Sequence, residues 1–286
     1  MRRIVIRGIA WVAQVGRSMS AQEFHLTIES DETVAIDALA AASQLPKARL
    51  NDALNKGAVW LQGRGSEQRL RRATKTLRRG DRLALYYDAE LLAREAPQPQ
   101  LIADEKAYSV WNKPAGMLAQ GTRYGDHCAL LRYCEKYFEP ARDCFLVHRL
   151  DREAEGLMLI AHTRKAADAF SQLWQQRDIE KCYRVSVNGK FGEVGERRII
   201  DSPLDDKPSE THIEVSHYDV LSERSTLDIT LITGRKHQIR RHLASIGFPV
   251  IGDYRYGRGG EPLALRAVSL AFKCPLSGRE KNFCID

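Results

Sequence analysis

Three charged side chains lie within four positions near the middle of the chain: Arg149, Asp151 and Arg152. Neighbouring positive charge favours the ionised form of a carboxyl group, so Asp151 is expected to be negatively charged. An ionised, oriented carboxylate can act as a covalent nucleophile. The alternative is a structural ion pair at a loop-to-strand junction, and these residues alone favour that alternative.

The neighbouring sequence indicates how such a carboxylate would be held. The apolar run after Gly156 is long enough for a buried strand, and the alternating pattern at 181–187 predicts a second strand carrying Tyr183. Thr233–Leu243 joins a strand to a helix, and cationic and amide side chains at a helix start form an anion-binding end. These strands are mixed with helices without regular βαβ alternation, which predicts an α+β fold.

The charge of the chain is concentrated in one segment. The formal net charge is +7, and residues 44–82 hold eleven Lys and Arg against three acids. A concentrated basic segment indicates a polyanionic partner. A solvated helix face is the structural alternative.

Composition excludes several other classes of protein. No apolar run approaches the roughly 18–20 residues that a membrane span needs, so no membrane partner is expected. The six cysteines form no CxxC pair and no His pair has ligand spacing, which argues against a metal site. Without a secretory signal, the cysteines indicate a reduced, cytoplasmic protein. We expect a monomer.

The basic segment resembles a known RNA-binding domain. Two short basic helices, at about 31–45 and 46–56, are followed by a Gly-Ala-Val turn and a closing strand led by Gly80-Asp81. This order resembles the S4 RNA-binding domain. The resemblance makes three basic residues of this domain RNA-binding candidates, namely Arg49, Arg71 and Arg72.

Three motifs in order resemble the RluA family of RNA pseudouridine synthases. They are Asn112-Lys113-Pro114-Ala115-Gly116, the segment around Asp151, and the segment from Thr233 through Gly252-Asp253 to Tyr256-Gly257. The resemblance implies a mixed, largely antiparallel sheet with flanking helices and a central cleft. It also implies an isomerase that detaches uracil from ribose and rejoins it through C5, with no cofactor and no metal.

The motif match assigns roles to individual residues. Asp151 would be the nucleophile, Tyr183 would stack on the base and assist proton removal, and Arg240 would pair with Asp151. His148 and His237 are expected to brace the loop. Four further residues would contact RNA: Arg149 in the space vacated by the flipped base, and Lys113, Arg235 and Gln238 nearby.

Three residues at two places in the chain depart from the family pattern. Ala154-Glu155 replaces the usual Thr-Ser, and Arg266 replaces the usual His in Leu265-Arg266-Ala267. These departures leave the substrate open. Ribosomal RNA is favoured over tRNA, and an RNA-binding or ribosome-assembly factor with weak catalysis is the alternative from another class.

Composition shifts suggest four segments. Residues 1–22 would be an N-terminal extension. Met19 stands just before a clean strand pattern, so Met19 is the expected natural start and residues 1–18 would lie upstream of it. Residues 23–93 would form the S4-like domain and 94–100, with two prolines, a linker. Residues 101–286 would form the catalytic domain.

Overall fold

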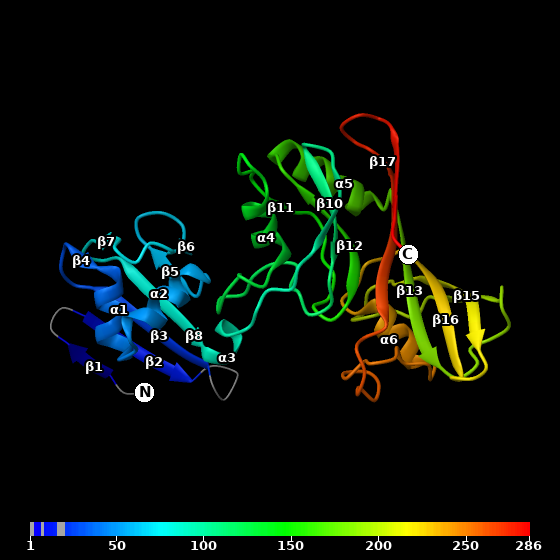
Figure 1. Cartoon of the computed structure of the whole chain (residues 1–286), viewed down its shortest axis with the longest axis horizontal. Coiled ribbons are helices and arrows are strands. Elements are labelled where there is room, and N and C mark those ends of the chain that lie inside the picture. Colours follow the sequence, from blue (N-terminus) through cyan, green and yellow to red (C-terminus); the bar gives the residue numbers. More distant parts are fainter. Residues whose placement is uncertain (1–2, 7–8, 16–20) are drawn as a thin grey trace. The chain divides into compact units, whose positions relative to one another are not determined.

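The computed structural model describes residues 3–6, 9–15 and 21–286, with side chains from residue 21 onward. The chain divides into two compact units (Figure 1). The first holds Met1–Ala96 together with Gln120–Tyr133, and the second holds Pro97–Ala119 together with Cys134–Asp286. Each unit has its own apolar core.

The first unit is a sheet covered by two helices. Its antiparallel strands follow the order β1 (Arg3–Ile6), β2 (Ile9–Val15), β3 (Ala21–Ile28), β8 (Arg82–Asp88), β5 (Val59–Gln62) and β6 (Gln68–Arg69). The predicted boundary between residues 22 and 23 falls inside β3, and β2 pairs with β3 from Ile9 opposite Ile28. The backbone of residues 9–15 therefore belongs to the sheet. Met19, the expected natural start, lies outside the described residues.

The two predicted helices are α1 (Ala35–Ser43) and α2 (Lys47–Asn55), and a short helix α3 (Ala89–Leu92) follows β8. Leu39, Leu50 and Leu54 are fully buried, because apolar residues at helical spacing face the core. Helix α1 begins only at Ala35, since β4 (Thr33–Val34) pairs with β7 (Thr76–Leu77).

The second unit is built on one large, mostly antiparallel sheet. Its order is β14 (Arg197–Ile200), β15 (Thr211–Asp219), β16 (Arg224–Leu231), β13 (Ile179–Asn188), β17 (Leu265–Lys273), β12 (Glu155–Ala161), β10 (Tyr108–Lys113) and β9 (Gln100–Asp104). Two short strands join its path: β11 (Phe145–Leu146) pairs with β12, and β18 (Glu280–Cys284) pairs with β17. Among these pairings, β12 with β17 is parallel. The predicted α+β class is confirmed.

Three helices accompany this sheet: α4 (Leu130–Tyr137), whose first residues belong to the first unit, α5 (Arg164–Gln176) and α6 (Gln238–Ser245). Helix α5 buries Phe170 in the core that contains β10 and β12. Helix α6 buries Ile239 and Leu243 against β13, β15 and β16 (Figure 1). The sheet thus has two cores, and the β12–β17 pairing joins the halves. No helix among the described residues is both long and apolar enough for a membrane span.

The segment Gln120–Tyr133 was predicted to belong to the catalytic domain, but it packs within the first unit. Its Asp126 carboxylate lies 3.1 Å from Arg69 Nε and 2.5 Å from Arg71 Nη2. Trp60 donates its indole N–H to the carbonyl of Arg123 at 3.0 Å. The two units are therefore not separated by a single boundary at 94–100. Composition could not predict this, because ion pairs between segments distant in the chain cannot be read from it.

Candidate active site

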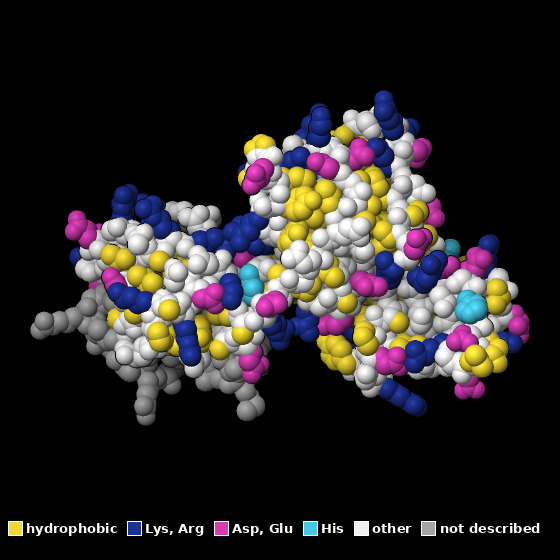
Figure 2. Space-filling view, viewed as in Figure 1, with side chains coloured by type: hydrophobic (Ala, Val, Ile, Leu, Met, Phe, Trp, Pro, Cys, Tyr) yellow, Lys and Arg dark blue, Asp and Glu magenta, His cyan; other side chains and the backbone are white. Residues whose placement is uncertain are grey.

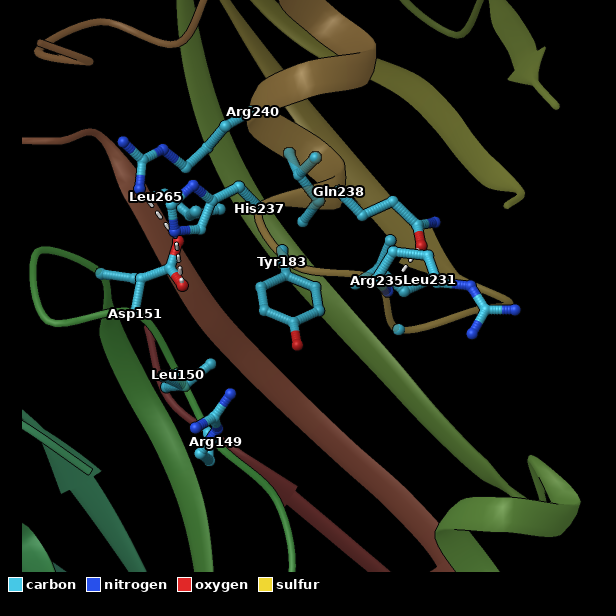
Figure 3. Close-up of a pocket in the computed structure, with 13 residues that line it drawn as sticks. Arg149, Leu150, Asp151, Tyr183, Leu231, Arg235, His237, Gln238, Arg240 and Leu265 are labelled. Atoms are coloured by element: carbon cyan, nitrogen blue, oxygen red, sulfur yellow. Dashed lines mark hydrogen bonds and ion pairs between the residues drawn. The ribbon is translucent and has the colours of Figure 1, made fainter. Parts of the chain in front are cut away.

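A cavity of about 130 Å³ in the second unit brings together the motifs found in the sequence (Figure 3). One side is the loop that carries Arg149, Leu150 and Asp151. Tyr183 of β13 and the segment that enters α6 line another part of the cavity, and Ala154, Leu231 and Leu265 complete its lining. In Figure 3 the Asp151 carboxylate points toward His237 and Arg240, and Tyr183 lies between this group and Arg235.

The loop that carries Asp151 connects β11 to the buried strand β12 and is braced by Lys113. Lys113 is fully buried, and its ammonium donates to the carbonyls of Met117 at 2.9 Å and Ala154 at 2.6 Å. Longer contacts reach the carbonyls of Pro114 and Arg152. Burial lowers the pKa of Lys113 to about 8, although Glu153 and Asp151 oppose the shift. The expected RNA contact of Lys113 is wrong, since this ammonium is inaccessible.

His148 braces the same loop from its other end. Its Nε2 accepts the backbone N–H of Leu159 in β12 at 2.9 Å, and its ring stacks on Trp174 of α5 at 4.3 Å. Burial strongly lowers the pKa of His148 to about 3, so the imidazole is neutral and free to accept. The structure therefore agrees with a bracing role for His148.

Asp151 and Arg240 form the ion pair that was expected from the motifs. Arg240 Nη1 donates to Asp151 Oδ2 at 3.0 Å. Arg240 is 1% exposed, whereas the Asp151 side chain is 26% exposed and faces the cavity. The buried guanidinium thus holds one oxygen of a carboxylate that a ligand can reach.

A second carboxylate holds Arg240 from behind. Arg240 donates from Nε to Asp253 Oδ2 at 2.7 Å and from Nη2 to Oδ1 at 2.9 Å, and Asp253 is 0% exposed. Burial disfavours the charge of Asp253, but hydrogen bonds from Arg240 and from the N–H groups of Tyr256 and Arg255 outweigh it and lower its pKa. Asp253 thus fixes the guanidinium that orients Asp151. Its position in Gly252-Asp253, within the third motif, was the available signal, but no role was predicted for it.

His237 approaches the other oxygen of Asp151, with Nε2 3.6 Å from Oδ1. It precedes α6 in a left-handed conformation, with φ 53°, and its Nδ1 lies 3.1 Å from the Tyr256 hydroxyl. Burial lowers the pKa of His237 more than the Asp151 charge raises it, and Arg240 adds to the decrease. The imidazole is therefore neutral near pH 7 and makes a polar contact, not a full ion pair. Its bracing role was expected, but its contact with Asp151 was not.

Tyr183 presents its ring to the cavity beside Asp151. Burial and the Asp151 charge raise the pKa of Tyr183 well above that of an ordinary phenol. At neutral pH the phenol is protonated, so it is a poor proton acceptor. Its local environment suits an aromatic face or a hydroxyl donor better than a general base.

Comparison with known proteins shows which family combines these motifs. A family model described as RNA pseudouridylate synthase matches residues 107–245. An RNA pseudouridine synthase of Aquifex aeolicus is 30% identical over 243 residues, which cover 77% of this chain and 75% of the relative. The chain belongs to the RNA pseudouridine synthase family. The isomerase class expected from the motifs is thereby confirmed at the level of the family.

Further relatives agree with this family. An RNA pseudouridine synthase of Chloroflexus aurantiacus is 34% identical, and the match covers 60% of this chain and 60% of that relative. Ribosomal large subunit pseudouridine synthase D of Xanthomonas campestris is 28% identical over 82% of this chain and 79% of the relative. The solved structure of human RNA pseudouridylate synthase domain containing 1 has a TM-score of 0.56 at 20% identity, covering 68% of this chain and 85% of that one. This likeness supports the pseudouridine synthase fold.

The remaining RNA-binding candidates of the pseudouridine synthase unit differ in accessibility. Arg149 is exposed at the cavity and has no polar partner within residues 21–286. Arg235 lines the cavity and donates to the carbonyl of Pro208 at 3.1 Å and 3.2 Å. Gln238 is buried, with its amide bonded to Thr233, Thr211 and backbone groups. The expected RNA contact of Gln238 is therefore wrong, because its hydrogen-bonding capacity is already used.

In the first unit, the three basic candidates also separate. Arg49 and Arg72 are exposed, and Figure 2 shows Lys and Arg side chains over parts of this unit's visible face. Arg71 instead bonds Asp126 and donates to the carbonyl of Asn55 at 2.9 Å. Its guanidinium is committed to holding the unit together, which makes it a poorer RNA contact than predicted.

The two departures from the family pattern lie next to each other. Glu155 and Arg266 are partners in the register of the parallel pair β12–β17, and Glu155 Oε1 lies 3.7 Å from Arg266 Nε. The acid and the base are thus opposite charges placed side by side, at a distance too long for a hydrogen bond. The two strands also approach closely at Gly156, since a side chain there would meet the backbone of Ala267. Within the described residues, no cluster of three or more His, Cys, Asp or Glu could hold a metal ion.

Proposed function

We propose that this protein isomerises specific uridines in structured RNA to pseudouridine, with Asp151 as the nucleophile. The observation that carries the proposal is an accessible carboxylate held by a buried arginine in a cavity beside Tyr183. Such a carboxylate can form a covalent bond to the nucleotide and later release it.

The reaction needs no change in composition. The glycosidic bond between N1 and ribose C1′ breaks, the uracil turns, and a bond forms between C5 and C1′. The proton on C5 is lost and N1 gains one, so substrate and product are isomers. Attack at C1′ and attack on the uracil ring are both open to an oxygen at this position.

Four residues would serve this reaction. Arg240 would orient Asp151, and Tyr183 would stack on the uracil. Arg149 would occupy the space that the flipped uridine leaves, since the base must leave its stack before a side chain can reach it. Arg235 would contact phosphate, which contributes affinity more than sequence selection.

Ribosomal RNA is the proposed substrate class. Two findings support it: relatives named ribosomal large subunit pseudouridine synthase D match most of this chain, and the first unit carries exposed basic side chains. We propose that this unit is the S4-like RNA-binding domain expected from the sequence. At the surface of this unit, Arg49 and Arg72 would contact RNA phosphates, in addition to the contacts made at the active site. Ribosomal RNA as substrate implies work in the cytoplasm, and we propose that the protein acts there as a monomer.

The decisive experiment compares the wild-type protein with Asp151→Asn. Total RNA from cells that lack the gene is treated with each purified protein, and pseudouridines are mapped at nucleotide resolution. We expect the wild type to restore one or a few sites in ribosomal RNA and the variant to restore none while still binding RNA. Pseudouridine formation by Asp151→Asn at the wild-type rate would disprove the assignment, and sites in tRNA alone would redirect the substrate.

A further inference from the structure

The segment that follows Asp253 is a loop fixed by hydrogen bonds. Two of its side chains contact groups of the active site. The Asp253 carboxylate accepts the backbone N–H groups of Arg255 at 2.9 Å and Tyr256 at 3.0 Å. The Asp253 carbonyl accepts the N–H groups of Gly257 and Gly259. The loop is therefore folded around one residue before any ligand arrives.

Two side chains tie this loop to the groups around Asp151. Asp253 holds Arg240, which donates to Asp151 Oδ2. The hydroxyl of Tyr256 lies 3.1 Å from His237 Nδ1, and the other nitrogen of His237 faces Asp151 Oδ1. The loop is thus a neighbour of the nucleophile on the α6 side of the cavity.

The outward side chains of this loop are an aromatic ring and two cations. Tyr254 is 66% exposed and makes no ring contact within residues 21–286. Arg255 and Arg258 are exposed and form no ion pair there, and residues 254–260 contain no acid. A large exposed ring on a preformed loop loses little entropy when it binds.

We propose that Tyr254 is a stacking platform for an unpaired base beside the target uridine, with Arg255 and Arg258 contacting the flanking phosphates. The proposal rests on the proposed function and adds a specific RNA contact to it. Unpaired bases are commonly recognised by stacking on aromatic side chains, whereas phosphates attract guanidinium groups. Gly259 and Gly260, with φ 65° and 88°, add no side chain that would keep an RNA backbone away.

A protein partner fits this surface less well. An apolar anchor that is buried at a protein interface is normally surrounded by further apolar contacts. Here the residues that follow Tyr254 include two arginines and three glycines. Of the two acids that flank the loop, Asp253 is buried and pairs with Arg240, and Glu261 pairs with Arg224 at 2.9 Å. Positive charge beside an exposed ring is the combination typical of single-strand recognition.

The test uses the full chain and a fluorescein-labelled twelve-nucleotide oligouridine, with a duplex RNA of the same length as the second probe. We expect Tyr254→Ala to raise the Kd for oligouridine about 10-fold and to change duplex binding little. Tyr254→Phe and Tyr254→Trp keep a ring and should bind within about twofold of wild type, since stacking tolerates any aromatic face. Arg279→Ala, which removes an exposed arginine from the β17–β18 turn, is the control and should not alter binding.

The salt dependence separates the arginines from the tyrosine. Replacing both Arg255 and Arg258 by Ala should reduce the slope of log Kd against log salt by about 1.4, because each single-strand phosphate contact contributes about 0.7. Tyr254→Ala should leave that slope unchanged. The proposal is overturned when folded Tyr254→Ala binds oligouridine as tightly as Tyr254→Phe, or when both probes lose equal affinity.

The same proteins are assayed for pseudouridine formation in ribosomal RNA. An active wild type together with unchanged binding by Tyr254→Ala refutes the platform alone. An inactive wild type refutes the proposed function, whatever the binding result. Full activity of Tyr254→Ala at RNA concentrations below the wild-type Kd would also count against the platform.

Discussion

Replacing Asp253 by Asn should destabilise the second unit and disable the enzyme without touching the nucleophile. Asp253 is 0% exposed and Arg240 is 1% exposed. The variant therefore removes the negative charge that pairs with this buried guanidinium. Breaking a buried ion pair by removing one partner costs about 3–5 kcal/mol. For a unit of this size that corresponds to a fall in Tm of about 6–20 °C.

The control is the ion pair that the next residue of the same helix forms. Arg241 donates to both oxygens of Asp205 at 2.9 Å and 3.0 Å through its two terminal nitrogens, whereas Arg240 contacts both oxygens of Asp253 through Nε and Nη2. Asp205 is 69% exposed, however, and water replaces its hydrogen bonds when the pair is lost. Asp205→Asn should therefore leave Tm and turnover close to those of the wild type.

Calorimetry measures the two Tm values, and single-turnover kinetics on RNA measures the chemical step. We expect Asp253→Asn to reduce the rate of that step, because Arg240 no longer has a fixed direction toward Asp151. Equal Tm shifts for Asp253→Asn and Asp205→Asn would refute the argument that burial decides the strength of these pairs. A normal rate at temperatures where Asp253→Asn is folded would refute its positioning role.

The same pair predicts a dependence of stability on pH. Because the folded state lowers the pKa of Asp253, the unfolded chain binds its proton more readily. This contribution to stability is present above the ordinary carboxyl pKa of about 3.9 and is lost as the pH falls through the lower pKa of the folded state. The wild type should therefore lose more stability than Asp253→Asn between about pH 5 and pH 2.

Three other perturbations test separate parts of the structure. Lys113→Met leaves buried carbonyls without a donor, which should cost about 1–3 kcal/mol and lower kcat more than it raises KM; an unchanged kcat would exclude its bracing role. The exchange of Glu155→Ser together with Arg266→His restores two of the three usual family residues and should keep activity, and a double-mutant cycle should give a coupling below about 1 kcal/mol; a larger coupling would mean that this half-buried pair is structural. Arg49→Glu combined with Arg72→Glu should flatten the salt dependence of RNA binding by at least about 1.4 with no change in Tm, whereas an unaltered salt dependence would remove the basic surface from the RNA site.

Motifs in the sequence predicted the centre of the site well. Asp151, Tyr183 and Arg240 lie far apart in the chain, and the structure brings them to one cavity. This was predictable because each belongs to a segment whose residue types and order are specific. The alternating pattern at 181–187 and the apolar run after Gly156 likewise predicted β13 and β12.

The site residues whose roles were predicted wrongly are buried in the structure. Lys113 and Gln238 belong to the two motifs that were expected to lie near Asp151 in the fold. Their polar side chains were therefore predicted to contact RNA. The structure buries both and commits their polar atoms to protein groups. Charge and position in the chain do not reveal whether a side chain points outward, so a brace and a ligand contact look alike in sequence.

Asp253 shows the complementary difficulty. Its place in the third motif was evident, but its role depends on the buried guanidinium that it meets, thirteen residues away in the chain. The ion pairs of Asp126 with Arg69 and Arg71 pose the same problem over a longer separation. Pairings of this kind follow from the fold, and only coordinates can reveal them.

The docking of Gln120–Tyr133 in the first unit has a consequence for how this chain can be cut or recombined. A protease that cleaves between residues 94 and 99 leaves Asp126 still clasped by Arg69 and Arg71, so the nicked fragments should co-purify. A fusion that joins residues 1–93 to another enzyme would lack Asp126, the carboxylate that pairs with two arginines of this unit. The first unit is therefore discontinuous in sequence, and a fusion must include residues 120–133 as well as the N-terminal segment.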